Sequence, residues 1–310
     1  MQKFLKKSGL LLFFSCLTYA ILCHPETALS YALAGLNAWF WKMIPTLFPF
    51  MVLSGMMLLL QLSDQFAGFF RPLLHPVFRV SSPCLYNIVI GFLCGFPMGS
   101  KITGELYRMG QITRQEAGFL LAFSNNIGPV FFTGFVLAYL PISVPLWVYL
   151  TGMYGIPLCY GLALRYLYYG RRISCANRIQ QTQTPLSFAA ALDASISSGI
   201  RSITKLGGYM IFFNLLNILP RLCFDHLPPA FCTLQAPVYL LMEITGGIVM
   251  TGTGHPLLIL VMLQFGGCSC IAQTYAMIGD TDLSMFSYVI HKILQSILAF
   301  GYYSVMLRLY

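Results

Sequence analysis

Two apolar runs in the first half of the chain are each broken by residues that do not suit a membrane helix. The run Leu85 to Phe96 breaks at GFPMGSK, Gly95 to Lys101. The run Ala117 to Phe123 breaks at SNNIGP, Ser124 to Pro129. A broken helix leaves backbone N–H and C=O groups without partners in hydrocarbon, so such breaks persist only inside protein or beside a polar cavity. Two breaks this close together predict a binding site.

The composition identifies the class of protein. Of the 310 residues, 57% are hydrophobic and 9% are charged, whereas about 25% of the residues of a soluble domain are charged. The chain is therefore predicted to be an all-α polytopic membrane protein that contacts membrane lipid. Its formal net charge of +9 does not predict nucleic-acid binding, because the basic residues are scattered between apolar runs, as in cytoplasmic loops.

The distribution of basic residues predicts the topology. Lysines precede the apolar run Leu10 to Cys23, which we expect to be an uncleaved transmembrane helix with a cytoplasmic N-terminus. A cleaved signal peptide is the alternative, because Ala32 to Ala34 resembles a cleavage site. If Leu85 to Tyr107 is a re-entrant hairpin, the arginines of residues 171–178 also lie in the cytoplasm, in agreement with the positive-inside rule.

The second half of the chain repeats the pattern of the first. Each unit contains three crossings and one re-entrant hairpin, and this odd number gives the two units opposite topology. Inverted repeats with broken helices in matching places are typical of secondary transporters. The matching blocks are Ala32 to Leu60 with Ala189 to Leu219, Tyr86 to Met98 with Val238 to Ile248, Gly118 to Phe132 with Leu257 to Ala272, and Pro145 to Leu167 with Ser284 to Leu307.

This repeat divides the chain into four parts: an N-terminal transmembrane helix (1–27), a first unit (28–170), a cytoplasmic linker (171–186) and a second unit (187–310). The tips at Gly95 to Lys101 and Ile244 to Ile248 are predicted to enter the membrane from opposite faces. The loop that holds Cys223 and Cys232 is then outside the cell, where the two thiols can form a disulfide.

The first break offers donors for an anion or a carbonyl group. Its glycines let backbone N–H groups face a ligand, and a half-helix that starts after the turn directs its positive end the same way. The alternative is a tight turn in which Lys101 pairs with Glu105. The candidate residues are Gly95, Pro97, Gly99, Ser100 and Lys101.

The second break offers amides, which suit a neutral polar solute because they both donate and accept hydrogen bonds. Alternatively, these amides satisfy the carbonyls that Pro129 leaves free. The candidates in this break are Ser124, Asn125, Asn126 and Gly128, and those in the matching place of the second unit are Gln264, Gly266 and Ser269.

Glu243 lies inside an apolar run next to Thr245. A carboxylate at membrane depth is costly and is a candidate for coupling to a proton or a sodium ion. The alternative is a salt bridge with Lys205 or Lys42. We expect Lys101, Asn125 and Asn126 to converge near the bilayer midplane with Glu243 and Gln264.

Enzyme, metal and cofactor motifs are absent from the sequence. It contains no Gly-x-Ser-x-Gly, no His-Glu-x-x-His and no dinucleotide fingerprint. The ten cysteines include no CxxC, and no histidine stands at ligand spacing from Cys268 and Cys270. We therefore expect neither catalysis nor a bound metal or cofactor.

The segment GFPMGSKITGELYRMGQITRQEAGFLLAFSNNIGPVFF resembles the YlbJ family of sporulation integral membrane proteins. The matching motifs are Gly95 to Lys101, Gly110 to Ala117 and Phe123 to Pro129. The resemblance implies two gate-type units related to the nucleoside-recognition gate domains of nucleoside and ferrous-iron transporters. It also implies a role in spore formation at the bacterial cell membrane.

Taken with the broken helices, the resemblance predicts alternating-access binding or movement of a small polar solute, nucleoside-like or anionic. The alternative is a membrane scaffold that acts in spore formation through partners. Those partners are other sporulation membrane proteins or further copies of this chain.

Overall fold

The computed structural model describes residues 2–170, 173 and 186–310, and these residues form helices and connecting turns without a strand. Five helical segments are long and apolar enough to cross a membrane, or six if α4 and α5, bent by 99° at their junction, make one span. These features confirm the all-α, multi-pass class. The predicted linker 171–186 lies almost entirely outside the described residues.

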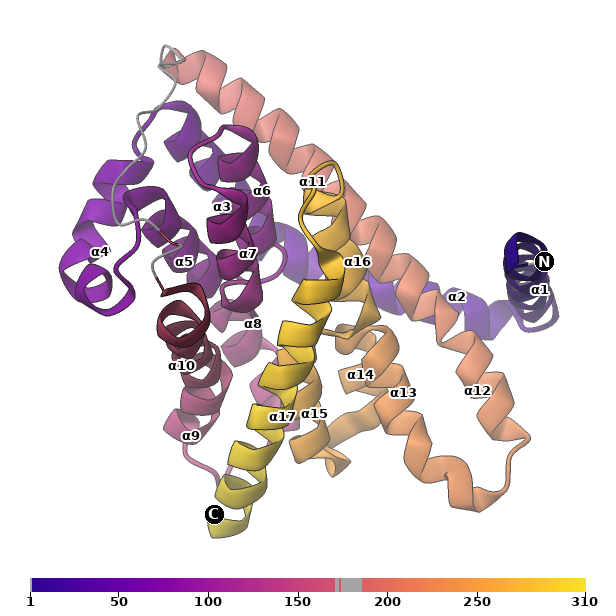
Figure 1. The fold of residues 1–310 in the computed structure, drawn as a ribbon. Coiled ribbons are helices and arrows are strands. Elements are labelled where there is room, and N and C mark those ends of the chain that lie inside the picture. Colours follow the sequence, from indigo (N-terminus) through magenta and orange to yellow (C-terminus); the bar gives the residue numbers. More distant parts are fainter. Residues whose placement is uncertain (1, 171–172, 174–185) are drawn as a thin grey trace.

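The helices follow one another with short connections (Figure 1). The first half contains α1 (Gln2–Cys23), α2 (Pro25–Ala38), the π-helix η1 (Trp39–Met43), α3 (Ile44–Leu59), α4 (Ser63–Phe78), α5 (Ser82–Cys94), α6 (Met98–Arg108), α7 (Arg114–Phe123), α8 (Pro129–Gly134), η2 (Val136–Tyr139), α9 (Leu146–Leu150), η3 (Thr151–Gly155), α10 (Ile156–Ala163) and η4 (Leu164–Tyr169). The second half contains α11 (Phe188–Leu216), α12 (Ile218–Asp225), η6 (Pro229–Leu234), α13 (Gln235–Met242), α14 (Ile244–Thr251), η7 (Gly252–Gly254), α15 (Pro256–Phe265), α16 (Gly267–Ile278) and α17 (Met285–Leu309).

Two long helical segments cross the molecule side by side. One runs through α2, η1 and α3, and the other is α11. Gly35 faces Met210 and Gly55 faces Ser195, so the residue numbers run in opposite directions and the two segments are antiparallel. At Gly35 an added Cβ would lie 2.7 Å from the Met210 carbonyl oxygen, which shows that a small residue is needed for this close approach.

Four of the interruptions between helices bear on the predicted breaks. In the first half, α5 and α6 are separated at residues 95–97, and α7 and α8 are separated at residues 124–128, as predicted. In the second half, α15 and α16 meet at Gly266. The interruption between α13 and α14 lies at Glu243, not at the expected tip Ile244 to Ile248.

The position of this interruption has a local cause. Glu243 has an extended backbone (φ −147°, ψ 123°), and its side chain accepts a hydrogen bond from the Gly246 N–H. It is therefore the N-cap of α14. The two glycines that follow, Gly246 and Gly247, lie inside the helix and do not break it.

Charged loops gather at one end of the molecule. Arg108 pairs with Asp280 at 2.9 Å and Arg114 with Asp282 at 3.0 Å, so the α6–α7 and α16–α17 loops lie together. The long α11–α12 segment leads away from these loops, and α12 ends in a distant part of the molecule (Figure 1). Cys223, in that distant part, is a free thiol, as is Cys232.

Candidate functional site

The first-half breaks contact each other through their backbones. Gly95 has a φ of +87°, which an L side chain rarely adopts, and a Cβ on it would lie 2.2 Å from the Gly128 nitrogen. A Cβ on Gly128 would lie 2.6 Å from the Cys94 carbonyl oxygen. Only glycine fits at these positions without moving one backbone away from the other. The hairpin tip and the α7–α8 break are therefore one packed unit.

Two breaks of the second half also pack against each other. Gly266 and Gly267 both have a positive φ, and a Cβ on Gly267 would lie 3.0 Å from the Leu240 carbonyl oxygen. The break between α15 and α16 thus packs against the end of α13, which leads into Glu243. Phe96 joins the two halves, because its ring lies 3.1 Å from where a Cβ on Gly266 would be.

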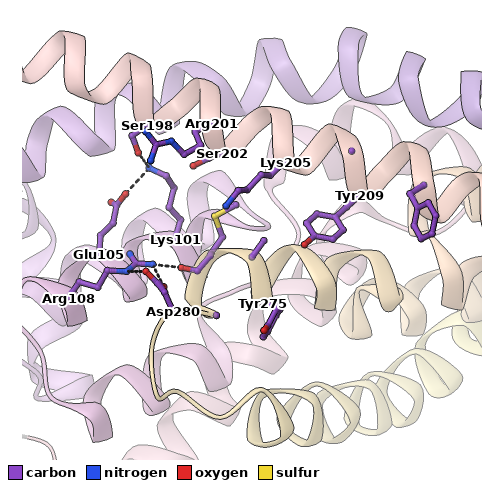
Figure 2. A pocket seen from close by; sticks show the side chains of 15 residues that line it. Lys101, Glu105, Arg108, Ser198, Arg201, Ser202, Lys205, Tyr209, Tyr275 and Asp280 are labelled. Atoms are coloured by element: carbon purple, nitrogen blue, oxygen red, sulfur yellow. Dashed lines mark hydrogen bonds and ion pairs between the residues drawn. The ribbon is translucent and has the colours of Figure 1, made fainter. Parts of the chain in front are cut away.

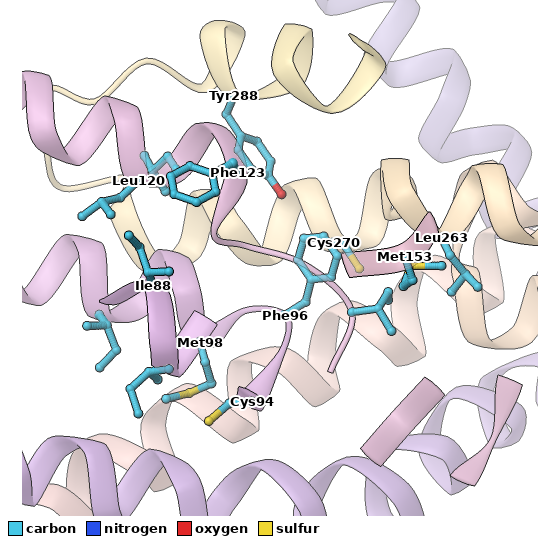
Figure 3. Packing of buried hydrophobic residues seen from close by; sticks show 14 of the residues in the cluster. Ile88, Cys94, Phe96, Met98, Leu120, Phe123, Met153, Leu263, Cys270 and Tyr288 are labelled. Atoms are coloured by element: carbon cyan, nitrogen blue, oxygen red, sulfur yellow. The ribbon is translucent and has the colours of Figure 1, made fainter. Parts of the chain in front are cut away.

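A narrow cavity of about 50 Å³ lies where these breaks meet. We call it the central cavity. Figure 3 shows Phe96 beside Cys270 and above Cys94 in this region. The cavity is bordered by residues of α3 and α11, by three of the breaks and by α16. The lining residues at or beside the three breaks and on α16 include Cys94, Phe96, Ile127, Gly128, Glu243, Ile244, Thr245, Cys270 and Gln273.

Glu243 is 1% exposed and is held by uncharged donors. Its Oε2 accepts hydrogen bonds from Asn214 Nδ2 at 2.8 Å and from the Gly246 N–H at 2.7 Å. Neither Lys205 nor Lys42 is its partner: Lys205 lines a different cavity and Lys42 is exposed. The carboxylate therefore has hydrogen bonds but no counter-charge among the described residues.

Lys292 is the matching buried cation, and its side chain is fully buried. Its Nζ donates to Asn126 Oδ1 at 3.1 Å and to Gln295 Oε1 at 3.5 Å, and lies 4.9 Å from the centre of the Phe96 ring. Within the described ranges it forms no ion pair. Phe96 lines the central cavity together with Glu243, and Lys292 contacts the ring of Phe96. An acidic and a basic side chain are thus buried near the same aromatic ring, each held by neutral groups.

The predicted amides lie at the breaks but bind protein groups. Asn125 accepts from the Ser100 N–H at 3.3 Å and donates to Thr274 Oγ1 and Tyr288 Oη at 3.0 and 3.1 Å. Asn126 donates to the Phe123 carbonyl at 2.7 Å. Asn125 therefore connects the first-half break to α16 and α17, and Asn126 connects it to α17 through Lys292. A ligand role for these amides stays a prediction.

The other predicted site residues lie in three places. Gly128, Glu243 and Thr245 line the central cavity. Lys101 lies elsewhere, paired with Glu105 at 2.8 Å, so the expected meeting of Lys101 with Glu243 does not occur. The remaining ones are packed into the breaks and their surroundings: Gly95, Pro97, Gly99, Ser100, Ser124, Gly266 and Ser269, with Gln264 donating to the carbonyls of Gly152 and Met153.

Sequence reasoning missed three polar groups near this site. Lys292 and Gln273 are polar residues inside the apolar helices α17 and α16. A lone ionisable residue in such a helix is itself a signal of function. Asn87 interrupts the first apolar run; it donates to the Gly99 carbonyl at 3.0 Å and accepts from Ser124 Oγ at 2.8 Å. Asn87 therefore links the hairpin tip to the α7–α8 break through these two hydrogen bonds.

Comparison with known proteins agrees with this membrane architecture. No family model and no solved structure matches the chain. The sporulation integral membrane protein YlbJ of Bacillus subtilis (strain 168) is 25% identical to it over an alignment of 325 positions, gaps included, that covers 93% of this chain and 79% of that protein. The chain is a relative of YlbJ. This relationship confirms the resemblance drawn from the broken-helix motifs.

Similarity to YlbJ across nearly the whole chain also confirms the multi-pass membrane location. The segment that carries the motifs, residues 95–129, forms the hairpin tip, α6, α7 and the break beside the central cavity.

Proposed function

We propose that the chain binds a small polar solute in the central cavity and moves it across the membrane by alternating access, in support of spore formation. The strongest support is the burial of Glu243 and Lys292 at the meeting point of helix breaks from both halves. A buried charge held only by neutral groups is costly. This cost favours a functional role in which the two side chains bind a solute or a coupling ion.

The groups around the cavity suit a nucleoside-like or an anionic solute. Phe96 supplies an aromatic face and Gln273 an amide, which together suit a base. Lys292 does not line the cavity, but its ammonium lies 4.9 Å from the centre of the Phe96 ring and supplies a positive charge for an anionic group. Glu243 is the candidate for coupling to a proton or a sodium ion.

The described conformation is closed. A cavity needs about 10–15 Å³ to hold one water molecule, so a cavity of about 50 Å³ holds only a few. A larger solute enters only if the tips move apart. The antiparallel long helices and the matched breaks supply two bodies that can move against each other, as in transporters with inverted repeats.

The test is uptake by purified protein in sealed liposomes. Radiolabelled uridine represents the nucleoside class and radiolabelled succinate the anionic class. We expect uptake of at least one of them above that of protein-free liposomes, and a dependence on a pH or sodium gradient that is lost in Glu243→Gln. Correctly inserted protein that takes up neither compound would favour the scaffold that acts through partner proteins.

A further inference from the structure

A second, larger cavity lies between α6, α11 and α16, separate from the central cavity. Its volume is about 840 Å³, and Figure 2 shows the side chains that line it. We call it the basic cavity, because its charged lining consists of four cations and two carboxylates: Lys101, Arg108, Arg201, Lys205, Glu105 and Asp280.

Two of the four cations are paired inside the cavity. Lys101 pairs with Glu105 at 2.8 Å, and Arg108 binds both oxygens of Asp280 at 2.9 Å. Arg201 and Lys205 form no ion pair with any residue that the structure describes. The basic cavity therefore carries an excess of two positive charges.

The unpaired cations are aligned on one face of α11. Ser198, Arg201, Ser202 and Lys205 recur every three or four residues, which places them side by side on a helix. Opposite them on α6, the Lys101 ammonium donates to Ser198 Oγ at 3.3 Å, and the Lys101 residue is 4% exposed. Hydroxyl and ammonium donors thus converge from two helices on one space.

The other end of the basic cavity is aromatic. Tyr209, Phe212 and Tyr275 line it, and Figure 2 shows Tyr209 and Tyr275 away from the Arg108–Asp280 pair. Tyr275 is 57% exposed and Phe212 is 41% exposed. Such a rim suits a molecule whose charged head enters the polar end while an apolar part stays outside.

We propose that the basic cavity binds a phosphate group, with Arg201 and Lys205 neutralising its charge and Lys101 and the α11 serines donating hydrogen bonds. Basic pockets between membrane helices recognise anionic lipid head groups, and guanidinium and ammonium donors match phosphate oxygens. The phosphate can belong to an anionic phospholipid or be free. This site is independent of solute transport through the central cavity.

The experiment measures thermal stabilisation of the full-length protein in detergent after removal of lipid. Phosphatidylglycerol is compared with phosphatidylcholine, and inorganic phosphate with chloride at equal ionic strength. The test variant is Arg201→Gln/Lys205→Gln. The matched control is Lys42→Gln/Arg71→Gln, which also removes one lysine and one arginine, both exposed and outside the cavity.

Losing a charge-assisted hydrogen bond weakens binding by about tenfold or more. We therefore expect half-saturation to need at least about tenfold more ligand in the cavity variant. The control, which removes two charges outside the basic cavity, is expected to stay within about twofold of the wild type. Stabilisation by phosphatidylglycerol alone identifies a lipid head group, and stabilisation by inorganic phosphate identifies a free anion. Stabilisation by neither, or equal weakening in both variants, would overturn the proposal.

Discussion

Replacing Lys292 by Met separates the structural role of the buried ammonium from its functional role. Methionine keeps an unbranched side chain of similar length and removes the charge. The change deletes the hydrogen bonds to Asn126 and Gln295, at 3.1 and 3.5 Å, and the contact with the Phe96 ring at 4.9 Å. The two buried amide oxygens lose this donor, and no other side chain is changed.

The expected effect on stability follows from opposing terms. A hydrogen bond to a charged group contributes about 1.5–3 kcal/mol, and a desolvated cation–π contact about 2 kcal/mol. Against this, burial of an ammonium costs several kcal/mol. The terms nearly cancel, so we expect the free energy of unfolding of Lys292→Met to lie within about 2 kcal/mol of the wild type.

Function is expected to respond differently. If the ammonium serves the solute, Lys292→Met inserts and unfolds like the wild type but loses liposome uptake and the ability to support sporulation. The control is Lys42→Met, the same change at an exposed residue, which should keep both. The measurements are thermal unfolding in detergent, uptake, and spore counts. Wild-type uptake by Lys292→Met would show that the ammonium does not serve the solute.

Three further predictions concern the glycine packing at the breaks, the role of Glu243 and the membrane topology. Gly128→Ala forces a Cβ to within 2.6 Å of the Cys94 carbonyl oxygen and should lower the free energy of unfolding by about 1–3 kcal/mol. The control Gly134→Ala, whose Cβ meets nothing within 4 Å, should change it by less than about 0.5 kcal/mol. Equal shifts of the melting temperature in the two variants would contradict the packing of the tip against the α7–α8 break. Glu243→Gln keeps an oxygen that can accept both hydrogen bonds, so it should insert and fold normally yet lose sporulation activity; full activity in a spore count would make the carboxylate only a helix cap. A membrane-impermeant maleimide added outside cells should label Cys223 but not Cys175, which lies outside the described residues; the reverse pattern would invert the topology.

The membrane class and the first-half breaks could be predicted from the sequence because their causes are local. A cluster of glycine, proline and asparagine favours a break in an apolar helix, although a lone proline such as Pro49 lies inside α3 without ending it, and long apolar runs require a bilayer. The pairing of Lys101 with Glu105 was also visible as an alternative, since residues four apart on a helix are neighbours.

The composition of the central cavity could not be predicted in this way. Lys292 reaches Asn126 across 166 positions of sequence, and only the packing of α17 against the first half brings them together. The prediction for the α13–α14 break was wrong: the two glycines favoured a break at Ile244 to Ile248, whereas the cap formed by Glu243 sets the start of α14. Caps of this kind depend on a side-chain rotamer and a buried partner, Asn214.

Alternating access at the central cavity can be tested most directly at Cys270, which lines it and is 6% exposed. A variant that retains Cys270 as its one cysteine is treated with a small charged methanethiosulfonate on either side of sealed membrane vesicles. A variant that retains Cys84, which is buried outside the cavity, is the control and should stay unlabelled. Alternating access predicts that Cys270 is labelled from both sides, as the tips part first toward one face and then toward the other. Labelling from neither side, or from one side alone, would contradict it.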